Sequence, residues 1–466
     1  MELIDDCLIS VFTFLTEEDL LSASAVCKGW NQAADTPWLW RRLCLQRWSF
    51  CNLSVLGNEN ITHSWKTYFL RRCHLESKMT TGRSGGYSCR SLRGHTGRVV
   101  GLVYLRGSSA QNPDLFTSSS TVCSASTDGT VRAWNVHNGE LLWCTPVQSP
   151  LTHIIRDEQS DAVITADSRG IIKTWQAGTG QEGASYSTGH PVSALVQYSV
   201  DKEWFLTIGT HLGSVCTLAD SALTKKSSIK VCDSFKVNIL LASPDKKWIA
   251  AGTKDNDDLS PKLIYTESLT CPSEDEEPLS RVVPVPGCQA AVFVPTQAAR
   301  LAIVHNRVDS HKALSVFDVS MRKTKYKSDI QIQQVESFNL SEIGQHSDIL
   351  LEAKDSNCFL LASGPQLWVF SVKGSVLARY KEHSMSISSL CLDNFRVVTA
   401  SQDLSLRVLT WSRGGDTGLE SRYHLLGGSH TMSRGFTHVA CDYTSIVASV
   451  EGKDGKDVLK AYVFTS

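Results

Sequence analysis

The sequence predicts an α plus all-β protein, in which a small helical module precedes a large β-propeller. Between Met1 and Leu45, apolar side chains recur at helical spacing in four short stretches with almost no loop between them. From Tyr87 onward, short apolar strands separated by Gly, Asp and Asn recur about every 40 to 45 residues, the period of propeller blades. The predicted domains are therefore a helical module at 1–48, a helical linker at 49–86 and a propeller at 87–466.

Four amphipathic helices are predicted in the N-terminal module. Thr16 with Asp19 three residues later is a capping signature for the second helix, and Pro37 suits the first position of the fourth. The apolar stripes of these helices consist of Leu8, Phe12, Leu15, Leu20, Val26, Trp30, Leu39 and Trp40. Because so short a unit buries too little surface to be stable alone, we expect the stripes to be exposed and completed by a partner, rather than hidden in a self-contained bundle.

Three motifs lie between Leu3 and Trp48: a leucine and phenylalanine helix, a V-C-K-x-W centre that ends at Trp30, and an L-W-R ending that starts at Leu39. Together they resemble the F-box, the adaptor segment that binds Skp1. F-boxes commonly open with Leu-Pro, whereas Ile4 follows Leu3 here, which implies a looser entry turn and weaker Skp1 binding. The residues that the resemblance implies for Skp1 binding are Leu3, Ile4, Leu8, Phe12, Leu15, Leu20, Val26, Trp30, Leu39 and Trp40.

A connecting helix is predicted in the linker. Trp65, Phe69 and Cys73 recur every four residues after a capping residue at Thr62, and the Gly-Ser-rich stretch 82–86 ends the pattern. We expect this helix to act as a rigid spacer between the module and the propeller.

The first predicted blade contains four polar residues at spacings typical of WD40 repeats. His95, Ser124, Asp128 and Trp134 are expected to form a buried hydrogen-bonded chain. In this hydrogen-bonded network the Asp128 carboxylate orients the His95 imidazole, and the Ser124 hydroxyl bridges the imidazole and the Trp134 indole. The indole N–H thereby gains the acceptor that a buried Trp requires. We therefore interpret His95 and Asp128 as structural rather than catalytic.

The later repeats keep only part of this pattern. One retains Thr165 and Trp175, and another retains His383 and Asp403 but has Leu409 in place of the tryptophan. The last repeat, 437–464, lacks a fourth strand, which 89–93 is expected to supply, closing the ring. Eight blades are favoured, and seven stays open because 325–364 can be divided in two ways.

The two halves together resemble the F-box and WD-repeat family over essentially the entire chain. The resemblance implies a substrate-recognition subunit of an SCF-type ubiquitin ligase, in which Skp1 brings the cullin and RING subunits. The propeller then captures an unidentified protein substrate for ubiquitination and proteasomal degradation, and the chain itself is not an enzyme. A Skp1-binding WD40 scaffold without ligase function is the alternative; it differs in failing to bring a cullin. The sequence has no P-loop or nucleophile elbow to indicate an enzyme.

The composition limits the kinds of partner that the protein is expected to bind. The net charge of -1 shows no basic excess, so neither nucleic acid nor a membrane is expected as a partner. The 15 cysteines are scattered singly, which predicts no metal site, cofactor or disulfide framework. Without a leader or a long apolar run, we expect a cytoplasmic or nuclear protein.

The sequence does not indicate which residues bind the substrate. Family members that read phosphorylated targets place arginines at two positions of a blade, which correspond here to Val100 and Thr127 in the first repeat and to Ser388 and Gln402 in a later one. Since none of the four is arginine, we expect capture by shape and neutral contacts. The acidic loop around Ser273 is either a solvated connection or a kinase target.

Overall fold

The computed structural model describes residues 5–48, 65–83, 85–105, 120–219, 222–272, 277–307, 311–323, 328–344, 348–354, 358–393, 395–412, 418–428 and 431–464. These residues form two compact units, which are described separately. The N-terminal unit contains the helices before Ser88, and the second unit contains the β-strands. The insertion at 108–119, residues 273–276 of the acidic loop, Leu3, Ile4 and Thr62 lie outside the described residues.

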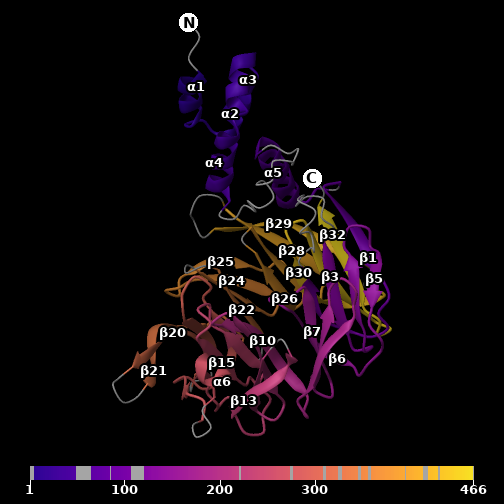
Figure 1. Cartoon of the computed structure of the whole chain (residues 1–466), viewed down its shortest axis with the longest axis vertical. Helices are drawn as coiled ribbons and strands as arrows, with labels where there is room; N and C mark the ends of the chain where they lie inside the picture. Colours follow the sequence, from indigo (N-terminus) through magenta and orange to yellow (C-terminus); the bar gives the residue numbers. More distant parts are fainter. Residues whose placement is uncertain are drawn as a thin grey trace. The chain divides into compact units, whose positions relative to one another are not determined.

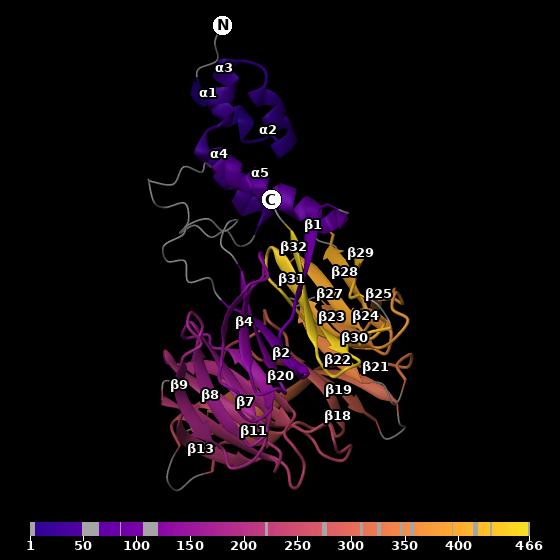
Figure 2. The same ribbon diagram turned by 90° about the vertical axis from the view of Figure 1, so that its right-hand side faces the viewer.

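Five helices build the N-terminal unit (Figure 2). They are α1 (Asp5–Phe12), α2 (Glu17–Ser24), α3 (Lys28–Ala34), α4 (Pro37–Arg47) and α5 (Trp65–Thr81). The Thr16 hydroxyl accepts a hydrogen bond from the Asp19 N–H at 3.3 Å, which caps α2. Pro37 is the first residue of α4, where its missing N–H leaves no intrahelical bond unmade.

The core of this unit is closed by α5. Phe69 is 1% exposed and packs on Trp40, with 5.5 Å between the ring centroids. Tyr68 joins the same cluster, and Trp48 donates a hydrogen bond from its indole to the Glu76 carboxylate. The apolar surface that four short helices lack therefore comes from the aromatic face of α5, which packs against α4. The helix is part of this core and not a free-standing spacer.

This packing corrects the expectation that the apolar stripes are exposed. Five of the eight stripe residues are buried, with exposed fractions of 5% or less: Leu8, Phe12, Leu20, Leu39 and Trp40. Leu15 and Trp30 are partly buried against the same cluster. The expectation was wrong because a helical stripe has the same sequence pattern whether a partner or a later helix of the same chain covers it.

The second unit is a β-propeller of eight four-stranded antiparallel sheets. Blades 1 and 2 consist of β2 (Val99–Tyr104), β3 (Thr121–Ser126), β4 (Val131–Asn135), β5 (Leu141–Cys144), β6 (Leu151–Arg156), β7 (Ala162–Asp167), β8 (Ile171–Gln176) and β9 (Glu182–Ser187). Blades 3 and 4 consist of β10 (Val192–Val200), β11 (Glu203–Thr210), β12 (Ser214–Ala219), β13 (Thr224–Lys230), β14 (Ile239–Ala242), β15 (Trp248–Gly252), β16 (Lys262–Tyr265) and β17 (Ser280–Val282), with the short helix α6 (Thr266–Thr270) after β16.

Blades 5 and 6 consist of β18 (Cys288–Phe293), β19 (Arg300–Asn306), β20 (Lys312–Lys323), β21 (Ser328–Asn339), β22 (Ile349–Lys354), β23 (Cys358–Ser363), β24 (Gln366–Ser371) and β25 (Val376–Tyr380). Blades 7 and 8 consist of β26 (Ile387–Leu392), β27 (Arg396–Ser401), β28 (Ser405–Trp411), β29 (Leu419–Leu426), β30 (Ser433–Cys441), β31 (Ser445–Gly452), β32 (Val458–Phe464) and β1 (Tyr87–Leu92).

The count of eight blades and the closure of the ring are both confirmed. The long strand β21 pairs with β20 as the fourth strand of blade 5, so the stretch 325–364 contributes to blades 5 and 6 and the count of seven is excluded. The last sheet has the order β1-β32-β31-β30. In Figures 1 and 2 the violet β1 lies beside the yellow β32, so the start of the propeller completes its last blade. Such closure leaves no long unpaired edge in the ring.

The hydrophobic cores of the propeller lie between neighbouring blades. Second strands are the most buried, and β7, whose sequence is AVITAD, is buried at every position. One cluster joins blades 5 and 6 through Leu314, Phe359 and Trp368. The turn between β3 and β4 requires glycine, because Gly129 has φ +81° and a Cβ there would lie 2.1 Å from the Gln148 carbonyl oxygen. Among the described helices, none is long and apolar enough to cross a membrane.

Candidate functional site

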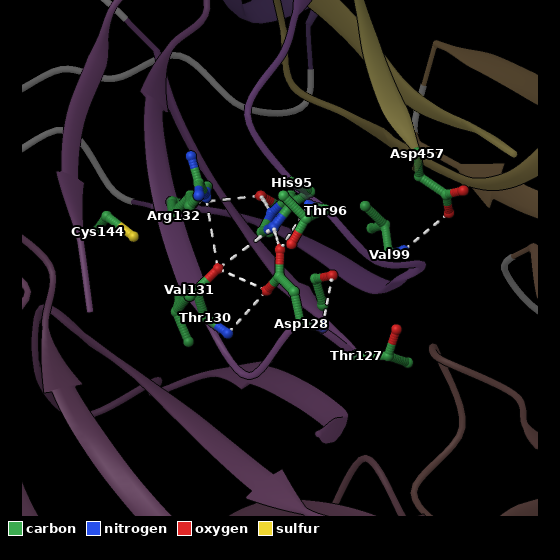
Figure 3. Close-up of polar contacts among 12 residues, drawn as sticks. His95, Thr96, Val99, Thr127, Asp128, Thr130, Val131, Arg132, Cys144 and Asp457 are labelled. Atoms are coloured by element: carbon green, nitrogen blue, oxygen red, sulfur yellow. Dashed lines mark hydrogen bonds and ion pairs between the residues drawn. The ribbon is translucent and has the colours of Figure 1, made fainter. Parts of the chain in front are cut away.

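Four side chains of blade 1 form one hydrogen-bonded chain. The His95 ring lies with Nδ1 2.9 Å from the Asp128 carboxylate and Nε2 2.8 Å from the Ser124 hydroxyl. The Trp134 indole N–H donates to the same hydroxyl at 2.9 Å. Figure 3 shows His95 and Asp128 turned toward each other, with Thr130 beside the carboxylate. The side chains of His95 and Asp128 are 1% and 6% exposed, so a substrate in solution does not reach them.

Hydrogen bonds keep Asp128 ionised in this setting. Burial raises the pKa of the carboxyl, but bonds from His95, Thr130 and the Thr96 N–H outweigh burial and hold the pKa well below its ordinary value. The carboxylate also accepts the Thr130 N–H at 2.9 Å within the β3–β4 turn, and its bonds to His95 and the Thr96 N–H tie this turn to the loop that carries His95. This arrangement supports a structural role for the chain of four residues.

Blade 7 repeats most of the arrangement without the tryptophan. His383 lies 3.0 Å from Asp403 and 2.8 Å from the Thr399 hydroxyl, and Leu409 is a buried core residue. Burial lowers the pKa of His383, which favours its neutral form. Blade 2 keeps a single bond of the set, from the Trp175 indole to Thr165 at 2.9 Å.

A buried aspartate links the last blade to the first. The Asp457 carboxylate accepts the Val99 N–H at 2.8 Å (Figure 3). The Asp457 N–H donates to the Gly97 carbonyl. Burial raises the pKa of this carboxyl above its ordinary value. The contact fixes the start of β2 against blade 8. No sequence pattern predicts it, because the two residues lie at opposite ends of the propeller sequence.

The structure locates positions on further blades that are equivalent to Val100. Inner strands of several blades contain one unpaired bulge residue after their first position. The bulge residues are Val100, Thr152, Ser193, Gln289, Ser388 and Arg434. Arg434 of blade 8 is therefore an arginine at a position that sequence reasoning could not assign.

Blade 8 carries a second cation at the position equivalent to Thr127. The Thr127 N–H donates to the Arg98 carbonyl and the Lys453 N–H donates to the Met432 carbonyl, which makes these two residues equivalent. The Glu451 carboxylate lies 3.5 Å from the Arg434 guanidinium and 3.0 Å from that of Arg98. The Glu451 carboxylate thus partly neutralises the positive charge of Arg434 and Arg98. Exposed ion pairs of this kind contribute little to stability.

The predicted Skp1-binding residues are distributed between core and surface. Five are buried in the N-terminal unit, as described above. Phe12 and Trp30 pack edge to face at 5.5 Å, and Trp30 keeps part of its surface exposed. Val26, in the turn before α3, is 63% exposed. Leu3 and Ile4 lie outside the described residues.

Sequence reasoning missed three strongly exposed apolar side chains of this unit. Phe14 is 87% exposed in the turn after α1, Val11 is 56% exposed on α1, and Trp38 is 52% exposed in the first turn of α4. The signal was present in the sequence, since all three lie off the apolar stripes that form the core. Large exposed apolar side chains are candidates for contact with another protein.

The described residues show no gathering of three or more His, Cys, Asp or Glu side chains of the kind that holds a metal ion. The cysteines of the described part of the chain are not joined in disulfides. Burial raises the pKa of the Cys288 thiol to about 12.

A family model for F-box-like domains matches residues 5–46. The chain carries an F-box-like domain. This F-box-like domain covers α1 to α4, and α5, which completes its core, follows the matched segment.

Two curated proteins are similar to the chain over nearly its whole length. F-box/WD repeat-containing protein 12 of Homo sapiens is 29% identical over 465 residues, covering 97% of both chains. F-box/WD repeat-containing protein 15 of Mus musculus is 22% identical over 458 residues, covering 98% of this chain and 97% of its own. The chain thus combines an F-box-like domain with a WD40-type propeller, and the resemblance to F-box and WD-repeat proteins is confirmed.

A solved structure supports the fold alone. The computationally designed Ika8 protein has a TM-score of 0.57 and 18% sequence identity, covering 80% of this chain and 98% of its own.

Proposed function

We propose that the chain is the substrate-recognition subunit of an SCF-type ubiquitin ligase. In this role the F-box-like domain binds Skp1, Skp1 links the chain to a cullin and a RING subunit, and the propeller captures a protein target for ubiquitination and proteasomal degradation. The F-box-like match carries the proposal, because F-box domains in general bind Skp1. The similarity to F-box/WD repeat-containing proteins over 97% of the chain supports the pairing of adaptor and receptor.

The exposed apolar residues of the F-box-like domain are the proposed contact with Skp1. Phe14, Trp38, Val26 and Val11 belong to a unit whose own core is already closed by α5. Their exposure is therefore not needed for packing within the unit. Aromatic side chains supply much of the energy of protein interfaces, and a central aromatic anchor commonly contributes at least about 2 kcal/mol.

Surface variants test the adaptor role without disturbing the core. Phe14→Ala and Trp38→Ala in the full-length chain should each weaken Skp1 binding, measured by titration with purified Skp1, by roughly tenfold or more. Melting curves should match the parent, because both side chains are largely exposed. Leu70→Ala on α5, 37% exposed and outside the F-box-like match, is the control and should bind normally. Full Skp1 binding by the Phe14 and Trp38 double variant would refute the proposed contact.

A non-ligase Skp1-binding scaffold is the second candidate, because the F-box-like domain supports Skp1 binding alone. The two roles differ in what Skp1 brings. Affinity purification followed by mass spectrometry, with and without a proteasome inhibitor, should recover Skp1, cullin and RING subunits together, and a target that accumulates under inhibition. Recovery of Skp1 without a cullin would favour the scaffold.

The proposed role is that of a receptor without catalytic activity, located in the cytosol or the nucleus. The buried setting of His95 and Asp128 supports this view of the propeller, since neither side chain reaches solvent. Fractionation of cells that express the chain, with Skp1 as a marker, tests the location. Ubiquitin transfer by the chain in the absence of cullin and RING subunits would contradict the receptor role.

A further inference from the structure

A cavity of about 310 Å³ lies among the inner strands of the propeller. Residues of β10, β14, β18, β22 and β26, the first strands of blades 3 to 7, form most of its wall. The wall is mixed, because it combines Leu241, Leu350, Leu390 and Ala291 with the polar residues Ser388 and Ser389. This volume is at the lower end of the range for ligand pockets, about 300 to 1,000 Å³, so the cavity suits one side chain rather than a large ligand.

Glu352 places a carboxyl group in this wall, beside the apolar side chains. The residue lies on β22 and is partly buried, and burial raises its pKa above the ordinary value. Among the described residues, no hydrogen bond or ion pair reaches the Glu352 side chain. A carboxyl group in an apolar environment costs free energy unless a partner satisfies it. A ligand that brings a positive charge and hydrogen-bond donors would supply this partner.

Nearby cations do not satisfy Glu352. Lys354, two residues further on the same strand, has its ammonium group 3.5 Å from the centre of the Trp411 ring. Lys254 is exposed at the edge of the cavity, between β15 and β16. There the Asp255 carboxylate accepts a hydrogen bond from Asn238, so the edge carries both signs of charge. The inner wall contains the single carboxyl group of Glu352.

The cavity has a charged edge at Lys254 and an interior that contains Glu352. Ile349 begins β22 and lines the cavity, and Glu352 follows three residues later, roughly 10 Å further along the strand. Asn238 immediately precedes β14, and Lys254 lies two residues after the end of β15. A long side chain with an apolar stem and a charged head therefore matches the cavity from its edge to Glu352.

We propose that the cavity binds a basic side chain of the protein target, with the aliphatic stem against Leu241 and Leu390 and the cationic head on the Glu352 carboxylate. This inference rests on the proposed function for the existence of a protein target, and it names the chemistry that the propeller recognises. Arginine fits best, because its planar guanidinium donates two parallel hydrogen bonds to one carboxylate.

The test compares matched tripeptides on the full-length protein by ligand-observed NMR. The probes are acetyl-Gly-Xaa-Gly-amide with arginine, with citrulline, which has nearly the shape of arginine but no charge, or with glutamate in the middle. The arginine peptide should bind, and the citrulline peptide should bind about tenfold more weakly or worse, because the charge-assisted hydrogen bonds are lost. Glu352→Gln should reduce the affinity for the arginine peptide to that for the citrulline peptide. Glu203→Gln, an exposed position at the start of β11, is the control and should change nothing.

Four results would overturn the inference: no binding of the arginine peptide, equal binding of arginine and citrulline, preference for glutamate, which would make Lys254 the dominant charge, or unchanged arginine binding by Glu352→Gln. If that variant fails to fold, the comparison of the three peptides on the unmodified protein still decides. Skp1 titration of the same preparation tests the proposed function separately, because it depends on residues of the N-terminal unit. Normal Skp1 binding without arginine binding would thus reject this inference alone.

Discussion

Replacement of Asp128 by alanine should destabilise the propeller by a measurable amount. The carboxylate accepts hydrogen bonds from the Thr96 N–H, the Thr130 N–H, the Thr130 hydroxyl and the His95 ring, at 2.9, 2.9, 2.7 and 2.9 Å. His95 and Thr130 are 5% and 4% exposed, so both lose an acceptor that water does not readily replace. At about 1 to 3 kcal/mol for each buried unsatisfied group, the loss amounts to about 2 to 6 kcal/mol.

Differential scanning calorimetry of Asp128→Ala and the parent measures this effect. A domain of this size shifts its melting temperature by about 2 °C per kcal/mol, which predicts a fall of roughly 4 to 12 °C. Asp454→Ala is the matched control. It holds the same place before a turn glycine in blade 8, is exposed, and accepts one hydrogen bond, from the Lys456 N–H. Equal melting of Asp128→Ala and the parent, or an equal fall in both variants, would refute the structural interpretation of the network.

Three further predictions concern the core of the F-box-like domain, the pH dependence of stability and the charge of blade 8. Phe69→Ala should destabilise the N-terminal unit by about 3 to 5 kcal/mol and should reduce Skp1 binding although Phe69 is buried, whereas Leu70→Ala, at an exposed position, should do neither. Hydrogen exchange of α1 to α4 measures the loss of stability. Normal protection of these helices in Phe69→Ala would contradict the prediction. Burial raises the pKa of the Asp403 carboxyl, but hydrogen bonds from the Ser405 hydroxyl and the Ser384 N–H outweigh burial and hold the pKa below its ordinary value. The stabilisation by this carboxylate is therefore present above about pH 4 and is lost as the pH falls below that value. The difference in melting temperature between the parent and Asp403→Asn should shrink between pH 6 and pH 3, and a constant difference would count against this assignment. The double variant Arg434→Gln and Lys453→Gln should keep most of its target binding, and the salt dependence of that binding should become weaker. The affinity is measured with phosphorylated and with phosphatase-treated target. Loss of most binding in the double variant, or after phosphatase treatment, would show that blade 8 binds a phosphate group of the target.

Local signals in the sequence were sufficient for the helix starts and for the residues of the first blade. The cap of α2 at Thr16 and the start of α4 at Pro37 could be predicted, because both effects depend on neighbours within four residues. The motif around Asp128 indicates its own partners, since the strand spacing brings Ser124 and Trp134 to the same side of the sheet. Such features depend on short-range geometry, which a single sequence contains.

Exposure in the F-box-like domain could not be predicted in the same way. Trp40 is buried in part because Phe69, on the later helix α5, packs against its ring, with 5.5 Å between the ring centroids. The apolar stripe of α5 was visible in the sequence, but its partner was not, since amphipathic spacing does not say which surface covers it. Once the stripes are assigned to the core, Phe14 and Trp38 are the aromatic side chains of α1 to α4 and their turns that are more than half exposed.

The charges around the propeller suggest two separable modes of recognition. Arg434 and Lys453 could be assigned only from pairing between strands, because the bulge before Gly435 and the bond from the Lys453 N–H to the Met432 carbonyl are not visible in the sequence. These cations belong to blade 8, whereas Glu352 belongs to the cavity of blades 3 to 7. If a target used the two sites through separate segments, Glu352→Gln would remove its selectivity for arginine and the Arg434 variant would change only its response to salt. Combined in one protein, the two effects should add, because residues of separate sites with no shared partners contribute independently. A strong coupling between the two variants would instead mean that the target binds both groups through one ordered segment.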